Sequence, residues 1–186
     1  MVQTAKFDPT QLEPTWDHLQ LVYEFLLRFV VSSDISATQL EKHINEGFLT
    51  VFLGLFNTVD PRERDYLKTT LHRTYGKSMA RRRFIRKSMC ETFQDFVNGT
   101  FHHNGISELL EILGSIANGF AVPLKEEHKH TLTDFLVPLH KMSTVDVYAP
   151  QLRYILECYV EKDPTLAGAV VDALARLDAI SLGGSE

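Results

Sequence analysis

Cysteine is nearly absent from this sequence. Its 186 residues include only Cys90 and Cys158, and no CxxC pair occurs. Two cysteines so far apart in the chain do not form a zinc site by themselves. This scarcity of cysteine is typical of a reducing compartment, so we expect the protein in the cytoplasm, the nucleus or both.

Long hydrophobic runs are also missing. The most apolar stretch, residues 19–31, contains Glu24 and Arg28 and is too short to span a bilayer. Residues 1–15 are polar and do not have the pattern of a signal peptide. We therefore predict that a membrane is not among the partners.

The sequence contains none of the common catalytic or cofactor-binding motifs. It has no GxSxG elbow, phosphate-cradling glycine loop, Rossmann fingerprint or HExxH spacing. His102 and His103, with Glu108 and Glu111 nearby, are candidates for a metal site, but adjacent histidines point in different directions. No carboxylate is isolated in a predicted apolar pocket that would tune its pKa. We predict a protein that is not an enzyme, with no catalytic residue, no metal and no cofactor.

The net charge of -5 disfavours nucleic-acid binding by the whole surface, but one segment is strongly basic. This basic segment contains Arg81, Arg82, Arg83, Arg86 and Lys87. One interpretation is a solvated helix face, which we favour for Arg81 and Arg83 individually. The other is an anion-binding patch, because guanidinium groups hold carboxylates and phosphates through paired hydrogen bonds. The pattern disfavours nucleic acid as a partner, because stacking aromatic residues are not interleaved with the cations.

Helical spacing dominates the rest of the chain, while sustained strand-like alternation is lacking. One apolar stripe recurs at intervals of three and four residues: Ile106, Leu109, Leu110, Leu113, Ala117 and Phe120. Asp60-Pro61 and Asp163-Pro164 read as helix starts, and Asn104 reads as a further N-cap. We predict an all-α protein with helices at residues 11–32, 36–57, 61–77, 80–100, 105–121, 124–142, 148–161 and 164–177.

The predicted helices form four hairpins that begin near residues 11, 61, 105 and 148. Their spacing of roughly 40 to 50 residues is close to the period of HEAT and armadillo arrays. We therefore predict an α-solenoid of about four HEAT-like hairpins over residues 11–177, with a compact helical bundle as the alternative. Residues 1–10 are assigned to an N-terminal extension and residues 178–186 to a C-terminal tail.

Two further features bear on binding. Ile112 and Ile116 lie to one side of the apolar stripe on their predicted helix. Either this repeat helix packs against two neighbours, or the two isoleucines form an exposed apolar floor for a partner. Lys125 and His128 are three residues apart, so they share a helix face.

Two segments resemble signature segments of the B-prime regulatory subunits of protein phosphatase 2A. They are residues 60–77, which begin Asp-Pro-Arg-Glu-Arg, and residues 102–129, which begin His-His-Asn-Gly-Ile. Residues 16–25 and 137–141 agree as well, and the resemblance covers residues 12–177. It implies a solenoid of HEAT-like repeats, in agreement with the predicted hairpins. It also implies a non-catalytic subunit that joins a phosphatase scaffold and a catalytic subunit and recruits client proteins.

The resemblance further implies a groove that binds motifs of the form Leu-x-x-Ile-x-Glu. Tyr75, Met79, Ile112 and Ile116 would line a pocket for the motif's isoleucine. Contacts to its glutamate and neighbouring acids would come from His72, Arg73 and Arg82. The leucine end would be bordered by Glu111, Lys125 and His128.

The sequence departs from the family at several points. Met79 replaces a usual leucine, and Arg81 and Arg83 are additional charges beside Arg82. The family continues for several more repeats, in which much of the contact with the catalytic subunit is expected. The alternative to a phosphatase subunit is a generic solenoid adaptor that binds acidic proteins or nucleic acid through residues 81–87.

Overall fold

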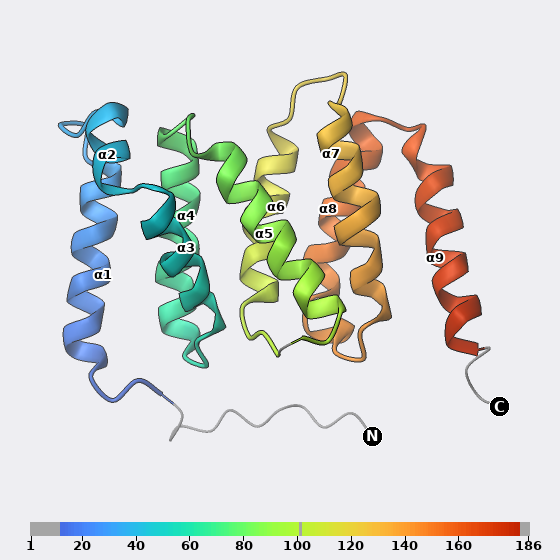
Figure 1. Ribbon diagram of the computed structural model, residues 1–186, viewed down its shortest axis with the longest axis horizontal. Coiled ribbons are helices and arrows are strands. Elements are labelled where there is room, and N and C mark those ends of the chain that lie inside the picture. Colours follow the sequence, from blue (N-terminus) through green and yellow to red (C-terminus); the bar gives the residue numbers. More distant parts are fainter. Residues whose placement is uncertain (1–11, 101, 183–186) are drawn as a thin grey trace. The chain divides into compact units, whose positions relative to one another are not determined.

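The computed structural model describes residues 12–100 and 102–182, with the backbone alone for residues 176–182 (Figure 1). Every regular element within these ranges is helical, which confirms the all-α prediction. The chain divides after Arg82 into two compact units. The first unit contains α1 (Trp16–Val31), α2 (Ala37–His43), α3 (Glu46–Gly54), the 3-10 turn η2 (Leu55–Asn57) and α4 (Pro61–Lys77).

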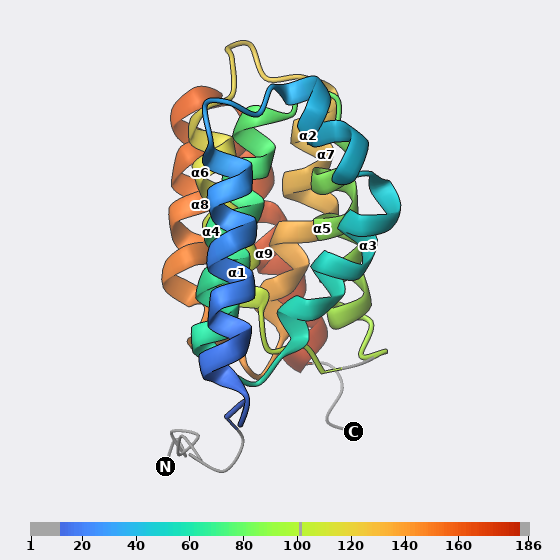
Figure 2. The same cartoon turned by 90° about the vertical axis from the view of Figure 1, so that its left-hand side faces the viewer.

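Within the first unit, α1 and α4 lie side by side and run in the same direction (Figures 1 and 2). The Tyr23 hydroxyl, at the middle of α1, donates a 2.6 Å hydrogen bond to the carboxylate of Glu63 near the start of α4. Near their ends, Lys77 Nζ donates to the Val30 carbonyl at 2.8 Å. The helices α2 and α3 return the chain from the end of α1 to the start of α4, so this unit is built on a helical hairpin plus the first helix of the next.

The second unit repeats this arrangement. Its helices are α5 (Arg82–Val97), which begins at the boundary, α6 (Ile106–Asn118), α7 (Glu126–His130), the π-helix η3 (Thr131–Leu136), the 3-10 helices η4 (Val137–Lys141) and η5 (Val145–Val147), α8 (Ala149–Lys162) and α9 (Leu166–Leu182). Gln151 Nε2 donates to Glu111 at 3.3 Å near the start of α8, and Lys162 Nζ donates to the Phe120 carbonyl at 2.9 Å near its end. Thus α6 and α8 also pack in parallel, and α9 packs on η4.

The sequence separation of these partners supports HEAT-like stacking in each unit. The residues joined by the four hydrogen bonds are 40 and 47 positions apart in the first unit and 40 and 42 apart in the second. These separations match the period of HEAT and armadillo arrays. The first helices of consecutive hairpins pack on each other, as α1 does on α4 and α6 on α8, and the second helix α9 packs on η4 of the preceding hairpin. This is the packing of the predicted solenoid.

The predicted stripe of α6 forms part of the core of the second unit. Its members within the helix are buried: Ile106, Leu109, Leu110, Leu113 and Ala117. Phe120 lies beyond the last residue of α6 and is only half-buried. The stripe is therefore confirmed, and burial of these aliphatic side chains holds α6 in place.

Two predicted long helices are interrupted. The helix expected at 36–57 breaks between Ile44 and Asn45, because the Asn45 side chain accepts the Phe48 amide at 2.9 Å and starts α3 as a new helix. The helix expected at 124–142 is α-helical only in α7 and continues as π- and 3-10 turns. Pro138 lies in this segment and has no amide hydrogen to donate, which is incompatible with an unbroken α-helical ladder.

The helix α9 begins later and ends later than predicted. The Asp163 carboxylate accepts the Thr165 amide at 3.2 Å, and the first helical residue is Leu166. Residues 178–182 were assigned to the tail but continue α9, and their residues include the helix-compatible Ala179 and Leu182. Residues 1–10 of the predicted extension and 183–186 of the predicted tail lie outside the described residues.

Candidate functional site

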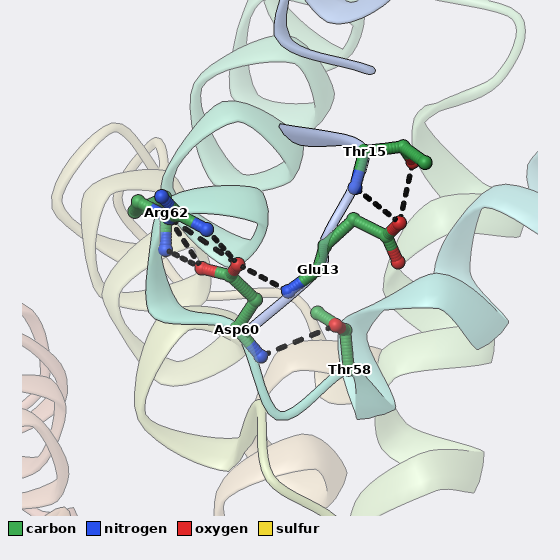
Figure 3. A network of polar contacts seen from close by, with 5 residues as sticks. All are labelled: Glu13, Thr15, Thr58, Asp60 and Arg62. Atoms are coloured by element: carbon green, nitrogen blue, oxygen red, sulfur yellow. Dashed lines mark hydrogen bonds and ion pairs between the residues drawn. The ribbon is translucent and has the colours of Figure 1, made fainter. Parts of the chain in front are cut away.

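The helix α4, which carries several candidate residues, is anchored at its first turn by Asp60 (Figure 3). Only 1% of Asp60 is exposed. Its carboxylate accepts the Arg62 amide at 2.9 Å, the Glu13 amide at 3.1 Å and the Arg62 guanidinium at 2.7 Å. The hydrogen bonds from Arg62, reinforced by the Glu13 amide, lower the pKa of Asp60 to about 2. The predicted Asp60-Pro61 helix start is confirmed, and it fixes the position of α4.

The last turns of α4 present His72 and Arg73 at the surface. Partial burial of the His72 ring and the positive charge of Arg73 lower the pKa of His72, so this imidazole is neutral at neutral pH. Both residues line a cleft of about 620 Å³, together with residues from the end of α1 and the turn that follows it. We call this the α1–α4 cleft; its lining residues include Val30, Val31, Ile35, His72, Arg73 and Lys77.

Tyr75 and Arg82 are in contact at the end of α4. Arg82 donates from Nε to the Tyr75 carbonyl at 3.0 Å and from Nη2 to the Gly76 carbonyl at 3.1 Å. Its guanidinium carbon also lies 5.2 Å from the centre of the Tyr75 ring. Arg82 thus satisfies carbonyls at the negative end of the α4 dipole. Met79 follows the helix and is 75% exposed.

Ile112 and Ile116 are buried in the second unit, with 1% and 5% of their surface exposed. The interpretation of an exposed apolar floor is therefore wrong. The alternative of a repeat helix packed on its neighbours describes them better, because α6 lies against α8 along its length. Their contact with a peptide stays a prediction.

The remaining candidates of the second unit differ in exposure. Lys125 is exposed at the residue before α7, and Glu111 is exposed on α6, where it accepts the hydrogen bond from Gln151. His128 is buried and stacks on Phe120, with ring centres 3.7 Å apart and ring planes at 8°. Burial, followed by the nearby Arg86 charge, lowers the pKa of His128, so this ring is neutral at neutral pH. Sequence reasoning missed Phe120 as the partner of His128.

Most cations of the basic segment are engaged within their own unit. Arg81 donates to the Glu41 carbonyl at 3.2 Å and lies 3.8 Å from the Glu46 carboxylate. Arg86 pairs with Glu127 at 3.0 Å and Lys87 with Glu91 at 3.3 Å. The prediction that Arg81 belongs to a solvated face is therefore wrong, since its side chain contacts both α2 and α3. Arg83 is exposed, as predicted.

These pairs weaken the adaptor alternative. An open anion-binding patch needs guanidinium and ammonium groups that face solvent together. Here Arg82 caps α4, and acidic side chains partly neutralise Arg81, Arg86 and Lys87. The segment is thus used largely for internal contacts.

His102 and His103 each make a local hydrogen bond. His103 Nδ1 accepts the Gly105 amide at 3.1 Å, and His102 Nε2 contacts Asn104 at 3.1 Å. Asn104 was predicted to cap α6, but Gly105 occupies that position without a side-chain cap. Among residues 12–100 and 102–182, no three His, Cys, Asp or Glu side chains gather as a metal site requires. Within the same ranges, every helix is too short or too polar to cross a membrane.

Comparison with known proteins gives a family. Residues 2–177 match the family model described as protein phosphatase 2A regulatory B subunit (B56 family). The chain is 51% identical over 176 residues to the delta isoform of the 56 kDa regulatory subunit from Oryctolagus cuniculus, covering 92% of this chain and 30% of the relative. It is 53% identical over 165 residues to the B' beta isoform of the 57 kDa regulatory subunit from Arabidopsis thaliana, covering 89% and 33%. The chain thus spans about a third of the length of these relatives.

Proposed function

The chain belongs to the B56 family of protein phosphatase 2A regulatory B subunits, and from this premise we propose that it is a non-catalytic module that recruits client proteins to the phosphatase. The relatives are named regulatory subunits of phosphatase 2A. The observation that carries the proposal is the family match over residues 2–177, since this range includes every candidate binding residue. We further propose that the chain associates with the phosphatase scaffold and catalytic subunits, in the cytoplasm, the nucleus or both.

Recruitment in this proposal uses short peptides with the pattern Leu-x-x-Ile-x-Glu. The glutamate is held by His72 and Arg73 of α4 and by Arg82. Arg73 supplies an exposed guanidinium, whereas neutral His72 supplies a hydrogen-bonding ring nitrogen. Arg82 keeps further donor hydrogens beyond the two bonded to α4, because a guanidinium carries five.

The apolar part of the motif meets a different set of side chains. Exposed Met79 and half-buried Tyr75 offer accessible apolar surface for the isoleucine. Ile112 and Ile116 are buried in the second unit and belong to the proposed pocket only through the 1% and 5% of their surface that is exposed. Lys125, His128 and Glu111 border the leucine. Burial of the two aliphatic side chains supplies most of the affinity, and the charged contacts fix the register.

A titration tests this function. A fluorescent peptide with the motif is added to the full chain, beside the same peptide in which the leucine and the isoleucine are alanine. We expect micromolar binding by the first peptide and a loss of at least about tenfold in the second, because each aliphatic side chain contributes burial. Equal affinities, or no binding by a folded chain, would contradict the proposal.

Salt separates this function from an electrostatic adaptor. The titration is repeated from low to high ionic strength. A partner held only by cations loses affinity steeply with salt, whereas binding through buried apolar side chains is largely retained. Steep loss combined with indifference to the alanine substitutions favours the adaptor.

A further inference from the structure

The α1–α4 cleft extends beyond His72 and Arg73, the two of its lining residues that the proposed motif uses. Its volume is about 620 Å³, and it is formed entirely within the first unit. One wall comes from the end of α1 and the turn after it, where exposed Val31 and half-buried Ile35 supply the apolar surface beside Ser32 and Ser33, while Val30 is fully buried. The opposite wall comes from α4 and includes His72 and Arg73, the two residues proposed to hold the motif's glutamate.

The polar groups of the cleft differ in their availability. Lys77 is engaged, because its ammonium donates to the Val30 carbonyl at 2.8 Å and to the Ser32 carbonyl at 2.6 Å. These bonds close the end of α1 and hold the apolar wall against α4. His72 is neutral at neutral pH, as its lowered pKa indicates. The exposed guanidinium of Arg73 is thus the main positive charge offered to a ligand at the rim.

The position of the peptide follows from the proposed function, on which this inference rests. The motif's glutamate is assigned to His72 and Arg73, which also line the cleft, and the residues before it belong to the motif. The residues that follow the glutamate are therefore the ones left to reach the cleft. Each extended residue advances about 3.3 to 3.6 Å, so three residues span about 10 Å.

We propose that the α1–α4 cleft is an extension subsite that takes an apolar side chain one to three residues after the motif's glutamate. The apolar wall removes the side chain of a leucine, isoleucine or valine from water, and Arg73 at the rim pairs with the glutamate that precedes it. Clients that carry such a residue bind more tightly than clients that carry the motif alone. The subsite thus selects among peptides with the same core motif.

The test uses the full chain and four peptides. One peptide has alanine at all three positions after the glutamate, and the other three have a single leucine at the first, second or third position. Partial burial of a leucine in the cleft predicts that at least one of these peptides binds about fivefold more tightly than the alanine peptide.

Two matched variants assign the gain to the cleft. Val31→Asn places an amide in the apolar wall, whereas Val51→Asn makes the same change on α3, outside the residues that line the cleft. Val31 and Val51 are both exposed, so neither substitution is expected to disturb folding much. The leucine gain should fall to less than about twofold in Val31→Asn and persist in Val51→Asn, while the alanine peptide binds all three proteins alike.

The outcomes separate the two proposals. If the alanine peptide binds but no leucine position improves affinity, the extension subsite is wrong and the proposed function stands. The same holds if the gain survives in Val31→Asn. If the alanine peptide does not bind a folded chain, the proposed function is wrong and the extension subsite falls with it.

Discussion

Replacing Asp60 by asparagine tests how the first turn of α4 is held. Asp60 is buried and accepts two backbone amides and the Arg62 guanidinium. Asparagine keeps the shape but removes the charge, and its NH₂ group cannot accept the hydrogen bonds that the second carboxylate oxygen accepts. The pKa of Asp60 falls from 3.8 to about 2 on folding, which corresponds to about 2 kcal/mol of stability at neutral pH.

The effect has a defined dependence on pH. Because the folded-state pKa lies below the unfolded value, the contribution is complete well above pH 3.8 and is lost as the pH falls toward about 2. We expect the difference in unfolding free energy between wild type and Asp60→Asn to be about 2 kcal/mol at pH 7. At pH 3 it should be about half as large, since the unfolded chain is then mostly protonated at this residue.

The measurement is urea unfolding followed by circular dichroism at the helical band, at pH 7 and in steps down to pH 3. With a slope of about 2 kcal/mol per molar urea, the midpoint should shift by about 1 M at pH 7. Asp65→Asn is the control, because it makes the same change in charge on an exposed residue of α4 whose ion pair with Lys68 contributes little. Equal shifts in the two variants, or a difference that does not shrink toward pH 3, would refute the reasoning.

Two further substitutions test the packing around the candidate residues. Gly114→Ala should destabilise the protein by about 1 to 3 kcal/mol in urea unfolding, because the new Cβ would lie 3.0 Å from the Tyr154 ring. The control Gly168→Ala has no neighbour within 4 Å and should be neutral or slightly stabilising. Equal effects of the two substitutions would contradict the close packing of α6 on α8. Arg82→Ala should cost about 1 kcal/mol through the lost bonds to the Tyr75 and Gly76 carbonyls, against less than about 0.5 kcal/mol for exposed Arg83→Ala. A neutral Arg82→Ala in the same assay would show that this cap does not stabilise α4.

Local sequence signals predicted a helix start correctly where a side chain bonds to the backbone of its own helix. Asp60-Pro61 predicted the start of α4, and the helix has the predicted bounds of 61–77. The apolar spacing of α6 predicted its buried face, because the three- and four-residue spacing of apolar side chains is a property of a single helix. The hairpin spacing predicted the repeat because the hairpins of a solenoid recur at a nearly constant period.

Local sequence signals predicted the wrong helix bounds where one segment carries both an apolar helical spacing and residues that start or interrupt a helix. Ser36 and Gln39 form a capping box and Asn45 caps a second start, yet the apolar spacing across 36–57 suggested one helix. Pro138 was visible in the sequence, but the π- and 3-10 turns around it are set by how the segment packs. Long-range contacts were beyond sequence reasoning altogether.

The candidate site illustrates the same limit. The sequence identified exposed His72 and Arg73 through a family resemblance, but nothing in it indicated that Lys77 closes the end of α1 and forms a cleft beside them. Likewise, the sequence alone suggested that the cations from Arg81 to Lys87 are exposed to solvent. Its partners Glu41, Glu46 and Glu127 are 35 or more positions away and become neighbours only on folding.

The most direct test of the central claim, that α4 holds the glutamate of a Leu-x-x-Ile-x-Glu motif, is a double-mutant cycle. The binding of the motif peptide and of its Glu→Gln form is measured for wild type, Arg73→Ala and the control Arg153→Ala, which removes an exposed arginine from α8. A charge-assisted pair at the surface predicts that Arg73→Ala weakens the parent peptide about fivefold and the glutamine peptide less than about twofold, while Arg153→Ala changes neither. Equal weakening of both peptides by Arg73→Ala, or none of either, would contradict the account.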